Sequence, residues 1–181
     1  NTSIGGGSFS SDNQEVLVTS NESGIYNVYT IPSSGGLPEP ITHSDTSSIF
    51  AISFFPDDDR ILFRSDNNGN EIYHIFKRDT DGSVTDLTPE PEARSSFYGW
   101  AHDKQSFFFT SNKRDERFMD LYEMTIDNFE AKMLFENAEG YNISALSPNK
   151  QYLALTKSIT TSINELFLYD LKNDKLISIS P

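Results

Sequence analysis

The chain has 181 residues, of which 36% are hydrophobic and 23% charged, and its 14 Phe, 8 Tyr and 1 Trp argue for a folded domain with a sizeable core. A formal net charge of −13 with no basic cluster argues against a nucleic-acid-binding face. The lack of cysteine excludes a disulfide scaffold, a thiolate zinc site and a cysteine nucleophile, and no apolar stretch approaches the roughly 18 residues of a membrane-spanning helix.

A short signature recurs four times along the chain, at intervals of 45, 46 and 46 residues. Its four copies are Phe9-Ser10-Ser11-Asp12, Phe54-Phe55-Pro56-Asp57, Trp100-Ala101-His102-Asp103 and Leu146-Ser147-Pro148-Asn149. After each copy comes a three-residue apolar run: Val16-Leu17-Val18, Ile61-Leu62-Phe63, Phe107-Phe108-Phe109 and Leu153-Ala154-Leu155. The repeat predicts four units, with approximate bounds 1–45, 46–92, 93–138 and 139–181.

Each unit has the pattern of four short strands. In the second unit these are predicted at residues 49–54, 60–64, 71–77 and 84–87, because β-branched and aromatic runs alternate there with Asp, Asn, Gly and Pro clusters that favour turns. Only residues 129–141 have apolar spacing that would also suit a helix, and the repeat places a strand in that segment. The Asp or Asn that ends each signature is predicted to be a turn residue needed for folding.

A period of about 45 residues holding four strands is typical of the blade of a β-propeller. The second strand of each unit is apolar on both faces, as expected where neighbouring blades cover it from both sides. We therefore predict an all-β protein with four four-stranded antiparallel blades, each whole, with no strand exchanged between the chain ends. Another all-β repeat or a sandwich is the alternative fold. An arc of a larger propeller is favoured over a closed four-blade ring.

The repeat unit resembles a known family. Phe-Ser-x-Asp, an apolar run, Ser-Asn or Ser-Asp, an Ile-Tyr pair, a glycine-bearing hairpin and Leu-Thr are similar to the propeller repeat of bacterial prolyl oligopeptidase family serine peptidases, of the dipeptidyl or acylaminoacyl peptidase type. They are also similar to the periplasmic propeller of the Tol system. Residues 5–32, 55–88 and 99–122 most resemble the peptidase branch. In that family the propeller caps a separate α/β-hydrolase domain.

The chain itself contains no predicted catalytic, cofactor-binding or metal-binding residue. Gly6-Gly7-Ser8-Phe9-Ser10 lacks the last glycine of a nucleophile elbow, and the three histidines, His43, His74 and His102, are scattered through different repeat positions. Residues 66–71 begin like a calcium loop, but Glu71 and Lys77 occupy the positions that require glycine and glutamate. A solvated turn is the preferred interpretation of that segment and of Asp57-Asp58-Asp59.

Function is expected where the repeats differ, and the loop between the second and third strands of the third unit has the densest charge cluster. Lys113, Arg114, Glu116 and Arg117 are therefore candidate contacts for a partner or substrate, since arginine forks suit carboxylates such as a peptide C-terminus. The competing interpretation is a solvated loop. The paired-glutamate motif with which dipeptidyl-peptidase relatives hold a substrate amino terminus is not reproduced here.

The resemblance implies a non-catalytic propeller segment that caps and gates a serine peptidase domain absent from this chain. Its expected partners are that hydrolase domain and the peptide substrate of the parent protein, with no nucleic acid, no cofactor and no membrane insertion. Self-association through exposed blade faces is also expected. The alternative is a stand-alone exported propeller that acts as a protein-interaction module. The resemblance favours a periplasmic or otherwise exported protein, with the cytoplasm left open.

Overall fold

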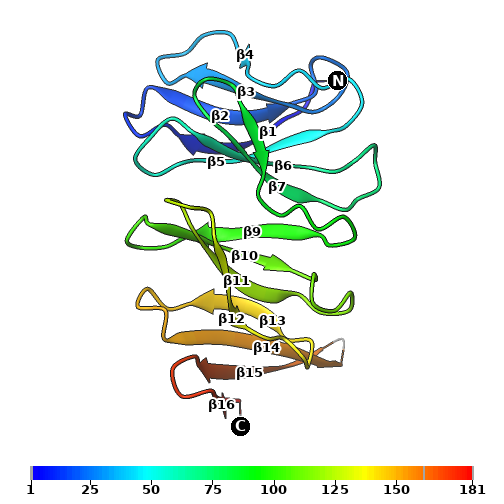
Figure 1. The fold of residues 1–181 in the computed structure, drawn as a ribbon, viewed down its shortest axis with the longest axis vertical. Helices are drawn as coiled ribbons and strands as arrows, with labels where there is room; N and C mark the ends of the chain where they lie inside the picture. Colours follow the sequence, from blue (N-terminus) through cyan, green and yellow to red (C-terminus); the bar gives the residue numbers. More distant parts are fainter. Residues whose placement is uncertain (1, 161, 181) are drawn as a thin grey trace. The chain divides into compact units, whose positions relative to one another are not determined.

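A computed structural model describes residues 2–160 and 162–180, so the chain ends Asn1 and Pro181, which bound the predicted first and last units, lie outside the described residues. The described residues form sixteen strands and no helix, and these strands make four separate four-stranded antiparallel sheets. Within each sheet the strands are adjacent in the order of the sequence, so every sheet is a simple meander, as Figure 1 shows. The predicted all-β fold of four antiparallel blades is confirmed.

The four sheets are named here blades one to four. Blade one contains β1 (Ile4–Phe9), β2 (Glu15–Ser20), β3 (Asn27–Pro32) and β4 (Glu39–Pro40). Blade two contains β5 (Ile49–Phe54), β6 (Ile61–Ser65), β7 (His74–Arg78) and β8 (Val84–Asp86). Blade three contains β9 (Ser95–Trp100), β10 (Ser106–Ser111), β11 (Asp120–Thr125) and β12 (Ala131–Phe135), and blade four contains β13 (Asn142–Leu146), β14 (Tyr152–Thr160), β15 (Ile163–Asp170) and β16 (Lys175–Ser178).

The structure shifts the start of one predicted strand and decides between strand and helix for one segment. Strand β7 begins at His74, three residues later than predicted, because Glu71 has a left-handed backbone with φ of 60° and donates its N–H to the Asp66 side chain at 2.9 Å. That hydrogen bond keeps residue 71 in the loop. The segment with helix-like spacing forms no helix: it contains the strand β12 and a loop that leads to β13.

The chain forms two compact units, Asn1–Tyr98 and Gly99–Pro181, and the boundary falls within β9. In the first unit, blades one and two share a core. Leu17 and Val28 of blade one pack in one cluster with Phe54, Ile61 and Phe63 of blade two. Backbone groups also join the blades, because the N–H of Ala51 donates to the Thr19 hydroxyl at 2.8 Å and the N–H of Ile49 to the Tyr26 carbonyl at 2.9 Å.

In the second unit the residues of β10 have the burial expected for a strand covered on both faces. Phe107, Phe108 and Phe109 are all at most 5% exposed. Blades three and four are in direct contact, with the Phe135 and Tyr169 ring centres 4.8 Å apart in an edge-on arrangement. Stacking of apolar sheet faces therefore builds the core of each unit.

The recurring Asp or Asn is a turn residue, as predicted. The backbone N–H two positions later donates to the side chain of Asp12, Asp103 and Asn149 at 2.9, 3.0 and 3.2 Å. Blade two uses the next residue for the same purpose, since Asp58 accepts the N–H of Arg60 at 2.9 Å. These hydrogen bonds replace backbone partners that a tight turn cannot supply.

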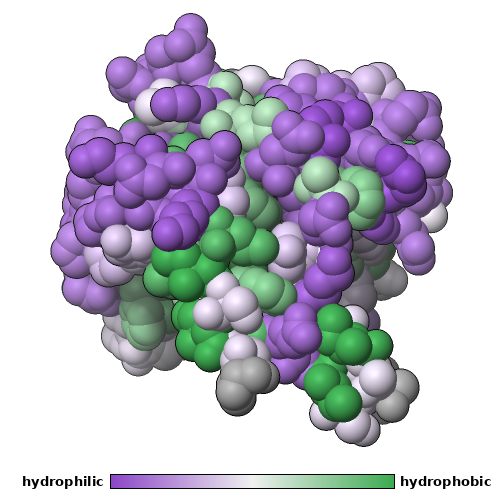
Figure 2. All heavy atoms as spheres, turned by 90° about the horizontal axis from the view of Figure 1, so that it is seen from below, coloured by the Kyte–Doolittle hydropathy of each residue, from purple (hydrophilic) through white to green (hydrophobic). Residues whose placement is uncertain are grey.

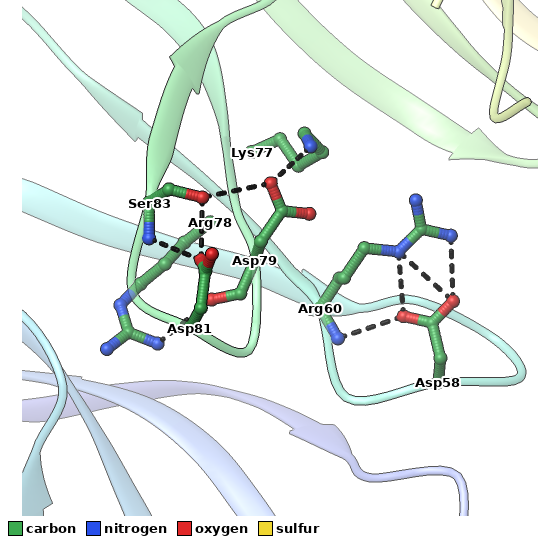
Figure 3. A network of polar contacts seen from close by, with 7 residues as sticks. All are labelled: Asp58, Arg60, Lys77, Arg78, Asp79, Asp81 and Ser83. Atoms are coloured by element: carbon green, nitrogen blue, oxygen red, sulfur yellow. Dashed lines mark hydrogen bonds and ion pairs between the residues drawn. The ribbon is translucent and has the colours of Figure 1, made fainter. Parts of the chain in front are cut away.

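Acidic residues at the turns of blade two have ion-pair or hydrogen-bond partners close by in the same blade. The polar network in Figure 3 contains Asp58, Arg60, Lys77, Arg78, Asp79, Asp81 and Ser83. The Arg60 guanidinium grips Asp58 at 2.7 to 3.1 Å and lowers the pKa of that carboxyl, while Lys77 pairs with Asp79. The Ser83 hydroxyl and N–H both donate to Asp81 and lower its pKa. Two acidic residues of this blade, Asp58 and Asp79, are therefore paired with cations of the same blade, and Asp81 is held as a carboxylate by its own turn.

Replacing Leu17 by alanine tests the shared core of blades one and two. Leu17 is fully buried, so Leu17→Ala should lower the free energy of unfolding by about 2–5 kcal/mol through lost burial and a residual cavity. Leu37 of the same blade is 88% exposed, and Leu37→Ala should change it by less than about 0.5 kcal/mol. Urea denaturation of both variants measures the difference, and equal effects would contradict a core at Leu17.

Candidate functional site

The charged loop predicted as a contact site consists of residues 112–119, between β10 and β11. The Arg114 side chain is bound to other residues of the second unit. Its Nε and Nη2 donate to the two carboxylate oxygens of Asp120 at 2.7 and 2.9 Å, a bidentate pair, and its Nη1 lies 3.5 Å from Glu136. The Asp120 side chain is completely buried, and its hydrogen bonds raise the pKa of Arg114.

Asp120 also ties this loop to the connection between β12 and β13. It accepts the backbone N–H of Asn137 at 2.7 Å, and the Asn137 side chain in turn donates to the Met119 and Tyr141 carbonyls at 3.2 and 2.8 Å. The Asn137 side-chain oxygen accepts the Tyr141 N–H at 2.8 Å. Arg114 is therefore one part of a buried polar network that holds two connections of the second unit together.

The other charged side chains of the loop are arranged around its surface. Arg117 forms a bidentate pair with Asp115 at 2.9 and 2.7 Å, which holds the pKa of the Asp115 carboxyl well below its usual range. The Lys113 ammonium lies 4.5 Å from the centre of the Tyr122 ring, and the backbone carbonyl of Glu116 accepts the Asn112 side chain at 3.2 Å. The four predicted contact residues thus share one loop. Both arginine forks bind carboxylates of the same loop and strand, so a role in partner contact stays a prediction.

Serine, histidine and aspartate do occur side by side in blade two. Ser65, His74 and Asp86 lie on β6, β7 and β8, line one cavity of about 280 Å³, and His74 Nδ1 is 2.7 Å from Asp86. The Ser65 hydroxyl donates to the Ser48 and Asp66 carbonyls at 2.9 and 3.3 Å instead of to His74. The nucleophile-to-base hydrogen bond of a catalytic triad is therefore missing from these three residues.

Within residues 2–160 and 162–180, no group of three His, Cys, Asp or Glu side chains converges in a way that could hold a metal ion. The calcium-like segment is organised by its own hydrogen bonds. Asp66 accepts the Glu71 N–H, and the Asn70 side chain accepts the N–H groups of Asn67 and Ile72. The described residues also contain no helix with the length and apolar character needed to cross a membrane.

A second cavity, which the sequence did not indicate, lies in the first unit around Arg64, and it is called the Arg64 cavity below. It has a volume of about 460 Å³, and its wall is formed by the first strands β1 and β5, by the ends of β2 and β6, and by Ser96 and Phe97 of β9. The Arg64 guanidinium lies 5.2 and 5.1 Å from the ring centres of Phe50 and Tyr73. Tyr26 packs on Phe50 at 5.1 Å and completes an aromatic wall.

Four-stranded meanders with this period are the blades of a β-propeller, and comparison with protein families agrees. Residues 40–179 match the family described as the prolyl oligopeptidase N-terminal β-propeller domain. The chain belongs to this family, as its repeat predicted. The comparison with curated proteins found no match.

Solved structures with the same fold include both kinds of protein that the repeat resembles. TolB of Acinetobacter baumannii superposes with a TM-score of 0.67 at 22% identity, covering 99% of this chain and 44% of that one. A puromycin hydrolase superposes with a TM-score of 0.69 at 12% identity, covering 99% of this chain and 31% of that one. A prolyl endopeptidase superposes with a TM-score of 0.66 at 13% identity, covering 99% of this chain and 29% of that one. The chain thus spans less than half the length of each of these proteins, and at these identities the likeness concerns the fold.

The buried network at Asp120 can be tested by removing its carboxylate. Asp120→Ala leaves the Asn137 N–H and the Arg114 guanidinium without their acceptor, so the free energy of unfolding should fall by about 3 kcal/mol. Asp115→Ala, which removes the partner of the 70% exposed Arg117, should change it little, because exposed pairs contribute little. Thermal denaturation of both variants makes the comparison. If Asp120→Ala were as stable as the unchanged protein, the stabilising role of the network would be contradicted.

Proposed function

We propose that this chain is a non-catalytic propeller segment that caps an α/β-hydrolase serine peptidase domain in a longer parent protein and limits access to it. The observation that carries the proposal is membership of the prolyl oligopeptidase N-terminal propeller family over residues 40–179. The geometry is compatible with it, since Ser65, His74 and Asp86, the adjacent serine, histidine and aspartate described above, are not hydrogen-bonded as a triad.

A propeller suits the role of a gate for a physical reason. Blades that share apolar cores, as blades one and two do around Leu17 and Phe63, form a stiff body that holds its shape while a second domain moves against it. Substrates then have to pass through or around the propeller, and their size becomes a criterion of access. This is how a domain without catalytic groups contributes to specificity.

The experiment uses the complete parent protein and chromogenic aminoacyl or peptidyl substrates. We expect hydrolysis that is lost when the serine of a downstream Gly-x-Ser-x-Gly elbow is changed to alanine, and no hydrolysis by the 181-residue chain alone. Deleting the propeller should allow cleavage of longer substrates. A parent reading frame without such an elbow would overturn the proposal.

That outcome would favour a second candidate, a stand-alone exported propeller that binds other proteins. The similarity to TolB over 99% of the chain is the observation in its favour. The candidate predicts specific binding of a partner protein by the complete protein without hydrolase activity. Export, proposed here for either function on the basis of the repeat, is checked by fractionation of cells that make the parent protein.

One sheet face of blade four, called its outer face, carries exposed apolar side chains. Leu166 and Leu168 of β15 share one sheet face with Ile177 of β16, because Leu168 pairs with Ile177 in the antiparallel register. The opposite face carries Tyr169, which packs on blade three. Leu166 and Ile177 are both 38% exposed, and Figure 2, which views the molecule from below Figure 1, shows apolar side chains in green among hydrophilic ones. We propose that a further blade covers this face in the parent protein.

In the 181-residue chain alone, a second copy should take the place of that blade. We expect concentration-dependent self-association in sedimentation experiments, driven by burial of Leu166 and Ile177. Ile177→Asp should weaken it at least about tenfold, whereas Val84→Asp at the exposed outer strand of blade two should leave it unchanged. A compact monomer at all concentrations would contradict the proposal.

A further inference from the structure

Arg64 occupies a position at which blade two departs from the other three. The residue directly after the apolar run of the second strand is Thr19 in blade one, Thr110 in blade three and Thr156 in blade four. Only blade two has an arginine there, at the same place in β6. A feature that every blade needs for folding would recur in every blade, so this arginine is not explained by the architecture of the repeat.

The surroundings of Arg64 also differ from those of three other arginines. Arg60, Arg114 and Arg117 each grip a carboxylate with two nitrogens. Among the residues that the structure describes, Arg64 contacts the Phe50 and Tyr73 rings but has no ion pair, and its side chain is exposed. The aromatic rings hold the guanidinium by cation–π contact while its N–H donors remain available to a ligand.

The charges that line the cavity differ from those of the first unit as a whole. Residues 1–98 contain 15 acidic and 5 basic side chains, so the first unit is strongly negative. None of its carboxylates lines the Arg64 cavity, and Arg64 is the one cation among the described lining residues. The remaining polar groups of the wall are hydroxyls and backbone amides, including Ser3, Thr19 and Ser96. An anion in this cavity meets one fork of donors and no opposing carboxylate.

Two of the residues that line the cavity are glycines, which leave space in it. Gly5 and Gly6 of β1 line it, and a Cβ placed on either would find no atom within 4 Å. Gly6 has φ of 78°, which favours glycine, whereas Gly5 does not have a left-handed backbone. Position 5 can therefore take a side chain that fills the space without straining the backbone.

We propose that the Arg64 cavity binds a carboxylate that carries an aromatic or apolar group, with the C-terminal residue of a peptide as the ligand class. The Arg64 fork would hold the two carboxylate oxygens in bidentate geometry, and Tyr26, Phe50 and Phe97 would receive the apolar side chain. The binding involves no covalent step. It requires only residues of the first unit and does not depend on whether a hydrolase domain follows in the parent protein.

The test compares two probes that differ only in charge, N-acetylphenylalanine and its uncharged amide, by NMR titration of the isotope-labelled 181-residue chain. We expect the acid to bind with millimolar affinity and the amide about tenfold more weakly or worse. Added salt should weaken binding of the acid, because an exposed ion pair is screened. Perturbed resonances should include those of Phe50 and Arg64.

Four variants locate the site. Arg64→Met should abolish the preference for the acid, Arg64→Lys should retain part of it because charge remains without the fork, and Gly5→Leu should reduce binding of both probes by filling the cavity. Arg117→Met removes an exposed arginine outside the Arg64 cavity, and this variant should bind the acid and the amide with the same affinities as the unchanged protein. Equal affinity for acid and amide in the unchanged chain, or unchanged binding by a folded Arg64→Met, would overturn the proposal.

Discussion

The structure depends on one requirement, that the apolar faces of each sheet be covered by the next sheet. A four-stranded meander alone has two faces and buries neither, so residues such as Leu17, Leu62 and Phe108 are placed in water unless neighbouring strands cover them. Packing of blade one on blade two, and of blade three on blade four, meets that requirement within each unit. The same requirement accounts for the apolar face that blade four still exposes.

Polar groups in this protein are mostly satisfied close to where they occur. Asp12 and Asp58 serve their own turns, Arg60 pairs with Asp58, and Arg117 pairs with Asp115. These carboxylates serve turns or ion pairs close to their own position, and the net charge of −13 is the excess of acidic over basic side chains that such pairs leave. Arg64, by contrast, has aromatic neighbours and no carboxylate partner among the described residues.

Repetition separates what folding needs from what function adds. Elements common to the blades, such as the turn Asp or Asn and the buried second strand, stabilise the fold and carry no specific chemistry. Two differences between blades concern charged side chains, the charged loop of residues 112–119 and Arg64. The first is bound into the protein by Arg114 and Asp120, whereas the second faces an open cavity. A domain that limits access to a catalytic partner can acquire specificity in this way without catalytic groups of its own.

Local pattern alone determined the all-β class, the four units and most strand positions, because strand periodicity and turn residues act between near neighbours in the chain. Only the tertiary structure decided the roles of the charged side chains. Arg114 belongs to a buried network because it binds Asp120, which also accepts the N–H of Asn137 from another connection, and His74 of β7 pairs with Asp86 of β8. Among the described residues, Arg64 contacts the aromatic rings of Phe50 on β5 and of Tyr73 before β7, and it has no carboxylate partner. Arg114 and Asp120 are 6 residues apart, His74 and Asp86 are 12 apart, and Asp120 and Asn137 are 17 apart. Each pair joins different strands or connections, and no residue spacing encodes which side chains of neighbouring strands and loops will meet.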